Sequence, residues 1–412
     1  MRIGIFSDTY TPFINGVSTS IVCLKKALEK KGHEVYVVTV NNEKMGYSYD
    51  EKERVMRIPA LKAGIYDYRL SMIYSFKAKK KIKELNLDVI HSQTEFGIGT
   101  FARLVAMELD IPIVHTYHTL YEEYLNSLTK NKIKYMVNGF VEYLAEYYCD
   151  SSIGELIVPT AKTKEIFKKQ YKFKREVHVI PNGIDLDKFS IENINKKELE
   201  KIKKQYGIKD TDFVIMYVGR LGPEKNIPFL ARAQKQIVKK HKNCKLVIVG
   251  EGPMKNELEK ITSSIRENVI FTGKIPQSDI QYYYRLADVF ATASKFETQG
   301  LTVIEALASG VCALCILDDS FKDALIDNVN GNFFETEKEY VDLVDKLMTD
   351  EKLLNKYKKN AIKTANEHSY LTFGDKVLEV YELAIKNNKE KTTRYMDRFK
   401  KTVKGVLKKW KF

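Results

Sequence analysis

The chain has 412 residues, of which 44% are hydrophobic and 30% are charged, with 68 Lys and Arg against 54 Asp and Glu. This length exceeds what a single hydrophobic core usually organises, so two domains are expected, and no apolar run reaches the roughly 18 residues of a membrane-spanning helix. The net charge of +14 predicts an anionic partner: a nucleic acid, an anionic membrane or a phosphorylated ligand. The N-terminal MRIGIFSDTY turns polar too soon for a signal peptide, and five scattered cysteines indicate a reducing cytoplasm.

Apolar strands alternate with amphipathic helices along the chain. In the first half we expect a helix at 19–32 and strands at 2–6, 34–40, 88–92 and 112–118. In the second half we expect a helix at 228–241 and strands at 213–220, 244–252, 268–273, 288–294 and 311–317. Continuous apolar strands separated by helices predict parallel sheets covered on both faces. The sequence therefore predicts two doubly wound Rossmann-like α/β domains joined near PNGIDLDKF (181–189), with ligands in the cleft at the carboxyl ends of the strands.

Several familiar motifs are excluded or are explained by structure alone. The chain contains no GxGxxG and no GxxxxGK[ST], which disfavours a nicotinamide dehydrogenase and a P-loop NTPase. Cys312 and Cys315 form a CxxC, but it lies in the apolar run VCALCIL, and no second pair completes a zinc site. We interpret this run as a buried strand.

Two basic residues follow the first strand of the second half, in VGRLGPEKN (218–226). Arg220 offers a forked guanidinium and Lys225 a point charge, and this combination suits a diphosphate. Their place at the carboxyl end of a strand favours a binding function over an ordinary solvated loop.

The stretch KFETQGLTVIEALASG (295–310) holds two glutamates around a predicted helix start. Free backbone N–H groups at such a start favour an anion, and carboxylates would repel it. Glu297 and Glu305 should therefore bond neutral hydroxyls, those of a sugar and of a ribose. A glycosidase pair is the rival, but eight residues of helical rise span up to about 12 Å, which fits the required separation poorly.

Together these motifs and the N-terminal FSDTYTPFINGVSTSI resemble the family 4 retaining glycosyltransferases of the GT-B fold over nearly the whole chain. The resemblance implies an acceptor-binding domain at 1–187, a nucleotide-sugar-binding domain at 188–370 and C-terminal helices at 371–412. It also implies that Arg220 and Lys225 hold the donor diphosphate, Glu297 the donor sugar and Glu305 the ribose. The helix start at Gly300, Leu301 and Thr302 completes the donor site.

Two further positions are assigned by the resemblance. Gly16, in the first strand–helix loop, would let the backbone approach the reacting centre. His118, in HTYHTLYEEY, would face the donor sugar; the pattern alone does not separate it from His115 on the same strand, and the family match favours His118. We expect His118, Glu297, Arg220 and Lys225 to carry catalysis.

No metal or other cofactor is expected. Asp185 and Asp187 mimic a metal-binding DxD, but they follow PNG at the domain join and are interpreted as turn and capping residues. Cationic Arg220 and Lys225 would instead neutralise the leaving diphosphate. The resemblance implies front-face substitution, in which the leaving phosphate accepts the proton of the acceptor hydroxyl and the protein supplies positioning and charge stabilisation.

The C-terminal RYMDRFKKTVKGVLKKWKF (394–412) has apolar residues at helical spacing and carries 8 − 1 = +7, half of the net charge. A basic amphipathic helix of this kind predicts an in-plane anchor on an anionic membrane; a frayed or packed helix is the alternative. Nucleic-acid binding would explain the charge but neither the apolar stripe nor the motifs, so none is expected. The predicted membrane-binding residues are Arg394, Arg398, Phe399, Lys400, Lys401, Lys404, Leu407, Lys408, Lys409 and Trp410.

Two more aromatic segments, 66–85 (also basic) and 132–148, suggest an acceptor taken from a membrane, although either segment can simply pack on the sheet. The N-terminal and HTYHTLYEEY stretches look most like bacterial enzymes that glucosylate 1,2-diacylglycerol. We therefore expect a UDP-sugar-dependent retaining hexosyltransferase, peripheral on the inner face of the cell membrane. It would move glucose from UDP-glucose to the 3-hydroxyl of diacylglycerol and make a possible lipoteichoic acid anchor. Extension of a capsular or undecaprenyl-linked glycan, or a non-enzymatic membrane protein, are the alternatives.

Overall fold

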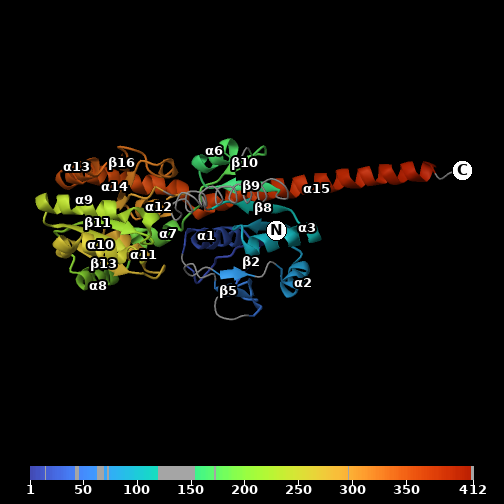
Figure 1. The fold of residues 1–412 in the computed structure, drawn as a ribbon, viewed down its shortest axis with the longest axis horizontal. Coiled ribbons are helices and arrows are strands. Elements are labelled where there is room, and N and C mark those ends of the chain that lie inside the picture. Colours follow the sequence, from blue (N-terminus) through green and yellow to red (C-terminus); the bar gives the residue numbers. More distant parts are fainter. Residues whose placement is uncertain are drawn as a thin grey trace, which may run out of the picture.

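The computed structural model describes residues 1–13, 15–41, 46–62, 69–71, 74–118, 154–170, 173–295 and 297–409, with side chains except at 62, 69–70 and 390–409. Two sheets, each flanked by helices, form two halves that lie side by side (Figure 1). This is the predicted pair of Rossmann-like α/β halves of the GT-B fold. The predicted segment 132–148 and the start of 66–85 lie outside the described residues.

The sheet of the N-terminal half has the strand order β10-β9-β8-β7-β1-β2-β4-β3, and only the β3–β4 pair is antiparallel. Its strands are β1 (Arg2–Phe6), β2 (Glu34–Val40), β3 (Ser48–Asp50), β4 (Val55–Ile58), β7 (Val89–Ser92), β8 (Ile113–Thr116), β9 (Glu155–Val158) and β10 (Val177–Val179). A separate hairpin-like sheet pairs β5 (Ala60–Lys62) with β6 (Arg69–Ser71). The sequence analysis did not predict β3, β4, β9 and β10, because isolated strands of three or four residues show no distinct periodicity.

The sheet of the C-terminal half is parallel throughout, in the order β13-β12-β11-β14-β15-β16. Its strands are β11 (Phe213–Val218), β12 (Cys244–Val249), β13 (Val269–Gly273), β14 (Val289–Thr292), β15 (Cys312–Ile316) and β16 (Gly331–Phe334). All residues of β15 are buried, which confirms the buried strand predicted for the CxxC. The sequence missed β16, whose GNFF carries little strand signal.

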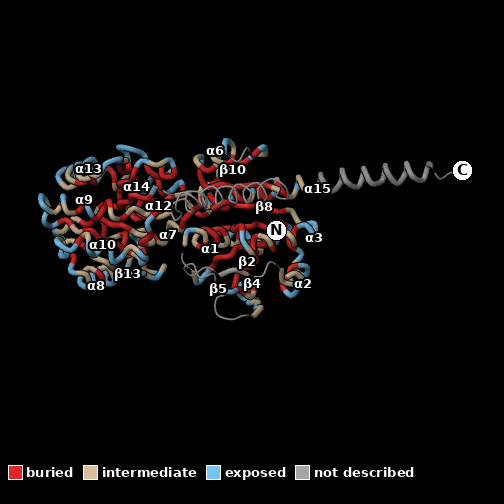
Figure 2. The backbone as a smooth tube through the Cα atoms, in the orientation of Figure 1, coloured by how far each residue is buried: buried red, intermediate tan, exposed pale blue. Residues whose placement is uncertain are grey.

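Helices cover both faces of each sheet. The described helices of the N-terminal half are α1 (Gly16–Lys30), α2 (Phe76–Leu85), α3 (Gly97–Leu109) and α6 (Ala161–Lys169). Those of the C-terminal half are α7 (Leu186–Phe189), α8 (Lys196–Tyr206), α9 (Ile227–Lys240), α10 (Lys255–Ile261), α11 (Ile280–Leu286), α12 (Leu301–Ala308), α13 (Glu337–Thr349) and α14 (Glu351–Ala365). Figure 2 shows the resulting red, buried interior within both halves.

Helix α1 begins three residues before the predicted start. Asn15 and Ser18 form a capping box: the Asn15 side chain accepts from the Ser18 N–H at 2.9 Å, and the Ser18 hydroxyl accepts from the Asn15 N–H at 3.0 Å. Gly16 is therefore the first residue of the helix and not, as expected, part of the preceding loop.

The last helix, α15 (Tyr370–Lys409), returns from the C-terminal half to the N-terminal half and continues past it (Figure 1). Its residues Val377 and Tyr381 are fully buried in one cluster with Ile3, Ile5 and Val114 of the N-terminal sheet. The domain boundaries remain a prediction, but part of the predicted C-terminal segment 371–412 completes the N-terminal core.

The backbone of the predicted basic tail is helical as far as Lys409. The side chains of residues 394–409 and the residue Trp410 lie outside the described part, so the structure does not test their proposed contacts. In the part of the chain that is described, no helix is both long enough and apolar enough to pass through a bilayer.

Candidate active site

The structure brings Lys225 and Glu297 together. Lys225 ends the short 3-10 helix η2 (Pro223–Lys225) after β11, and Glu297 lies in the loop after β14. The Lys225 ammonium bonds the Glu297 carboxylate at 2.5 Å, and each side chain is about one-fifth exposed. Two residues that the sequence assigned separately to phosphate and sugar therefore meet at the carboxyl ends of neighbouring strands.

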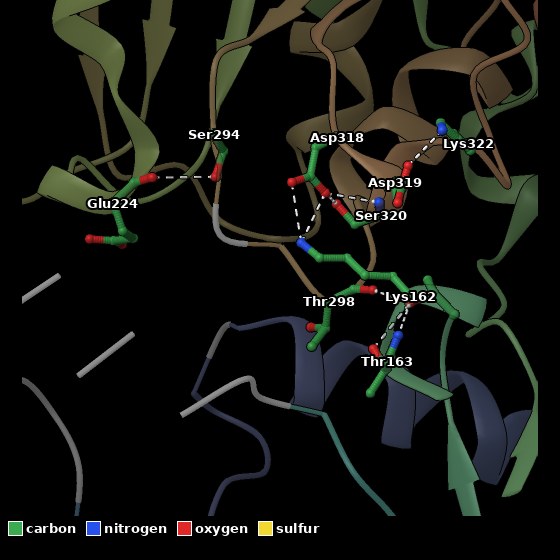
Figure 3. A network of polar contacts seen from close by, with 10 residues as sticks. Lys162, Thr163, Glu224, Ser294, Thr298, Asp318, Asp319, Ser320 and Lys322 are labelled. Atoms are coloured by element: carbon green, nitrogen blue, oxygen red, sulfur yellow. Dashed lines mark hydrogen bonds and ion pairs between the residues drawn. The ribbon is translucent and has the colours of Figure 1, made fainter. Parts of the chain in front are cut away.

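Arg220 is held by a buried carboxylate. Its Nη2 contacts Glu224 Oε1 at 2.5 Å, and only 4% of the Glu224 side chain is exposed. The Glu224 carbonyl also accepts the Ser294 hydroxyl at 3.5 Å, so this loop is tied to the end of β14 (Figure 3). The sequence predicted Arg220 and missed Glu224.

Helix α12 begins directly after the Glu297 loop, close to its predicted position. Gly300 is its N-cap, so no side chain caps the first turn, which contains Leu301 and Thr302. A Cβ at Gly300 would lie 2.6 Å from the Phe321 ring, and this close packing requires glycine. The first turn of α12 therefore has no side-chain cap, and an uncapped helix start favours an anion.

Glu305 lies one turn inside α12 and is buried. The Tyr284 hydroxyl donates to its carboxylate at 2.8 Å. Burial raises the pKa of Glu305, and the Tyr284 hydrogen bond offsets part of that effect. Glu297 and Glu305 thus have different partners, Lys225 and Tyr284.

The structure separates the two candidate histidines. His118 follows β8, and its Nε2 lies 2.6 Å from Gln93 Oε1, whereas His115 Nε2 lies 3.1 Å from Glu95 Oε1. Burial, followed by the nearby His115, lowers the pKa of His118 to about 3. His118 is therefore a neutral imidazole at physiological pH.

Polar contacts join His118 and its neighbours to the loop of the other half that carries Glu297. The Thr298 hydroxyl donates to the His118 carbonyl at 2.6 Å, and the Thr298 carbonyl accepts the Thr160 hydroxyl at 3.0 Å. Gln299 Oε1 accepts from the Asn182 amide N–H at 2.8 Å. The two halves therefore hold the Glu297 loop between them.

Two further contacts cross between the halves. Lys162 of α6 pairs with Asp318 after β15 at 3.1 Å, with both side chains 16% exposed (Figure 3). A Cβ built on Gly16 lies 3.7 Å from Leu301, so the first helix of the chain approaches the start of α12. Lys162 and Asp318 are 156 residues apart and gave no sequence signal.

Asp185 does not act as the predicted cap. It precedes α7, but its side chain makes no capping hydrogen bond and pairs instead with Lys26 of α1. This ion pair joins α1 to the segment between the two halves. Within the described ranges, no cluster of three His, Cys, Asp or Glu side chains could hold a metal ion.

The fold and this arrangement are those predicted for a transferase: two basic residues, a helix start and two glutamates lie on one half, and His118 is joined to that half through Thr298. Sequence comparison is consistent with this class. The family model described as "Glycosyltransferase Family 4" matches residues 14–188, and the model described as "Glycosyl transferases group 1" matches residues 198–364. The chain belongs to the family 4 glycosyltransferases and is a hexosyltransferase.

Two curated relatives resemble the chain over most of its length. An alpha-monoglucosyldiacylglycerol synthase from Streptococcus pneumoniae is 34% identical over 401 residues, covering 95% of this chain and 88% of that protein. A second from Acholeplasma laidlawii is 33% identical over 398 residues, covering 95% and 99%. Among solved structures, Anabaena HepE in complex with UDP-glucose shares the fold with a TM-score of 0.73 at 17% identity, covering 93% of this chain and 99% of that one.

Proposed function

We propose that this protein transfers glucose from UDP-glucose to the 3-hydroxyl of 1,2-diacylglycerol, with retention of configuration, giving alpha-monoglucosyldiacylglycerol. The observation that carries this proposal is the similarity to two alpha-monoglucosyldiacylglycerol synthases along almost the entire chain. The arrangement of Arg220, Lys225, Glu297 and Glu305 supports it, because these residues present cations for a diphosphate and carboxylates for hydroxyls.

In this mechanism the leaving diphosphate is stabilised by protein charge. Arg220 and Lys225 and the first turn of α12 face its oxygens, so the reaction needs no metal. Lys225 exchanges Glu297 for phosphate when the donor binds, which frees Glu297 for the sugar hydroxyls. Glu305 receives the ribose, and His118 contacts the sugar. The leaving phosphate accepts the acceptor proton on the face from which it departs.

A transfer assay tests this function. Purified protein with radiolabelled UDP-glucose and vesicles of diacylglycerol and anionic lipid, in EDTA, should give a labelled monoglucosyl lipid with the alpha configuration. An undecaprenyl-linked or capsular acceptor is the competing possibility. Labelling of that acceptor with no labelled diacylglycerol product would contradict the proposed function, and activity only after a divalent cation is restored would contradict the metal-free mechanism.

The proposed site of action is the cytoplasmic face of the cell membrane, where anionic lipids attract basic segments. The sequence 394–412 carries a charge of +7 (8 − 1), and its backbone is helical through Lys409. Each basic side chain near an anionic surface contributes about 1 kcal/mol. The glycolipid product could serve there as a lipoteichoic acid anchor.

Deleting residues 394–412 should release the protein from anionic vesicles, because the deletion removes both the basic charge and the apolar stripe. Co-sedimentation with vesicles should fall at least tenfold. The affinity for UDP should stay unchanged, since the buried part of α15 is retained. Neutral phosphatidylcholine vesicles serve as the control for charge. Undiminished binding to anionic vesicles after the deletion would refute the anchor.

A further inference from the structure

A chain of buried side chains extends from α15 to His118. The Tyr381 hydroxyl lies 2.7 Å from His91 Nδ1, and Thr116 Oγ1 lies 2.7 Å from His91 Nε2. Gln93 follows β7, contacts His91 through its amide nitrogen, and contacts His118 through its amide oxygen at 2.6 Å. Tyr381, His91 and Gln93 are all at most 2% exposed.

The position of the Gln93 amide over His91 defines its orientation. Gln93 Nε2 lies 3.1 Å from both ring nitrogens of His91. Equal short distances to both place it over the ring face, because a position in the ring plane would collide with the carbon between the nitrogens. An N–H group interacts favourably with a π face, whereas a carbonyl oxygen would be repelled by it. The oxygen of Gln93 therefore points to His118.

A glutamine oxygen only accepts hydrogen bonds, so its partner atom on His118 must carry the proton. This leaves Nδ1 of the neutral imidazole as an acceptor. Among the described residues, the titratable side chains that act on His118 or His91 are the histidines themselves and His115 on β8, and His115 is in turn engaged by Glu95.

We propose that Gln93 is a positioning residue for the transfer reaction: it accepts the Nε2–H of His118 and so presents Nδ1 as an acceptor to a hydroxyl of the donor sugar. His91, anchored by Tyr381 of α15 and by Thr116, holds the Gln93 amide in the orientation that this requires. This inference rests on the proposed contact of His118 with the donor sugar. It makes the C-terminal helix part of the support of the active site.

The tautomer is measured on the free protein. In two-bond ¹H–¹⁵N spectra of protein labelled on its seven histidines, the His118 signals are assigned by their loss in His118→Asn. We expect the Nε2–H tautomer in the wild type, and a shift toward Nδ1–H or a mixture in Gln93→Leu. Tyr381→Phe removes only the hydroxyl that anchors His91 and should give a smaller shift in the same direction.

Kinetics provide the second readout. Gln93→Leu should lower kcat/KM for UDP-glucose about 10- to 100-fold, with the affinity for UDP, which lacks the donor glucose, unchanged. Gln93→Glu keeps an acceptor but adds a charge that raises the pKa of His118. Its activity should approach the wild type at high pH and fall as pH decreases and His118 becomes protonated, an inflection that the wild type lacks.

The matched control is Gln234→Leu, which removes another buried glutamine, one whose amide donates to the Cys244 carbonyl in the other half. It should alter neither the His118 tautomer nor the pH profile. An Nδ1–H tautomer in the wild type, or a Gln93→Leu variant with wild-type tautomer and kinetics, would overturn the proposal. A wild-type protein that shows Nε2–H but labels no diacylglycerol would instead contradict the proposed function.

Discussion

Glu297→Ala should reduce glucosyl transfer about 100-fold or more while leaving UDP binding intact or tighter. The carboxylate that bonds Lys225 at 2.5 Å is the proposed contact for the sugar hydroxyls, so its loss removes a polar interaction needed in the transition state. The same change frees the Lys225 ammonium for the diphosphate and removes a negative charge beside it. The measurement compares kcat/KM for UDP-glucose with the calorimetric Kd of UDP.

Glu297→Gln is the graded variant, because its amide still hydrogen-bonds hydroxyls but no longer carries charge, and it should lose less activity than the alanine. Glu259→Ala removes another glutamate of the same half, one that lies 3.9 Å from Lys255 and is half exposed. This control should change neither quantity. Full transferase activity in Glu297→Ala would remove Glu297 from the donor site.

The second large effect is expected for the Arg220→Ala variant, which should lose both transferase activity and stability. Transfer should decrease about 100- to 1000-fold because a cation of the diphosphate site is lost. The free energy of unfolding should decrease by about 3 kcal/mol, because the buried Glu224 carboxylate loses its guanidinium partner. Steady-state kinetics and denaturant unfolding measure the two losses separately.

Adding Glu224→Gln to Arg220→Ala separates these contributions. The double variant should recover most of the stability, since no unpaired buried charge remains, but none of the activity. Arg232→Ala is the matched control: Arg232 pairs with Glu337 at 2.7 Å but is half exposed, so its loss should cost less than about 1 kcal/mol. If the double variant regained transfer, Arg220 would act through the fold and not through the donor.

The alternation of apolar strands and amphipathic helices was sufficient to predict two parallel sheets. The strands at 2–6 and 34–40 have their predicted bounds, because long apolar runs are buried in a sheet covered on both sides. Short strands such as β10 and β16 could not be predicted, since their few residues take up strand conformation through pairing with a neighbour and not through their own pattern.

The candidate site also has a part that the sequence could predict and a part that it could not. Local motifs were enough to predict Arg220, Lys225, Glu297 and Glu305 as site residues, because strand ends and helix starts position side chains close to their own sequence. They could not identify partners that come from elsewhere in the chain, such as Thr160 for the Thr298 carbonyl or Tyr284 for Glu305.

The sequence by itself determined the fold class and the family, and it predicted which residues face a nucleotide sugar. Only the tertiary structure decided which partners hold these residues. Lys225 pairs with Glu297, Arg220 pairs with Glu224, and His118 hydrogen-bonds Gln93. The tertiary structure also returned α15 to the N-terminal core, where Tyr381 meets His91 across 290 residues of sequence. The physical reason is that periodicity records which face of an element is buried, whereas a pair of distant side chains is set only when whole elements pack together.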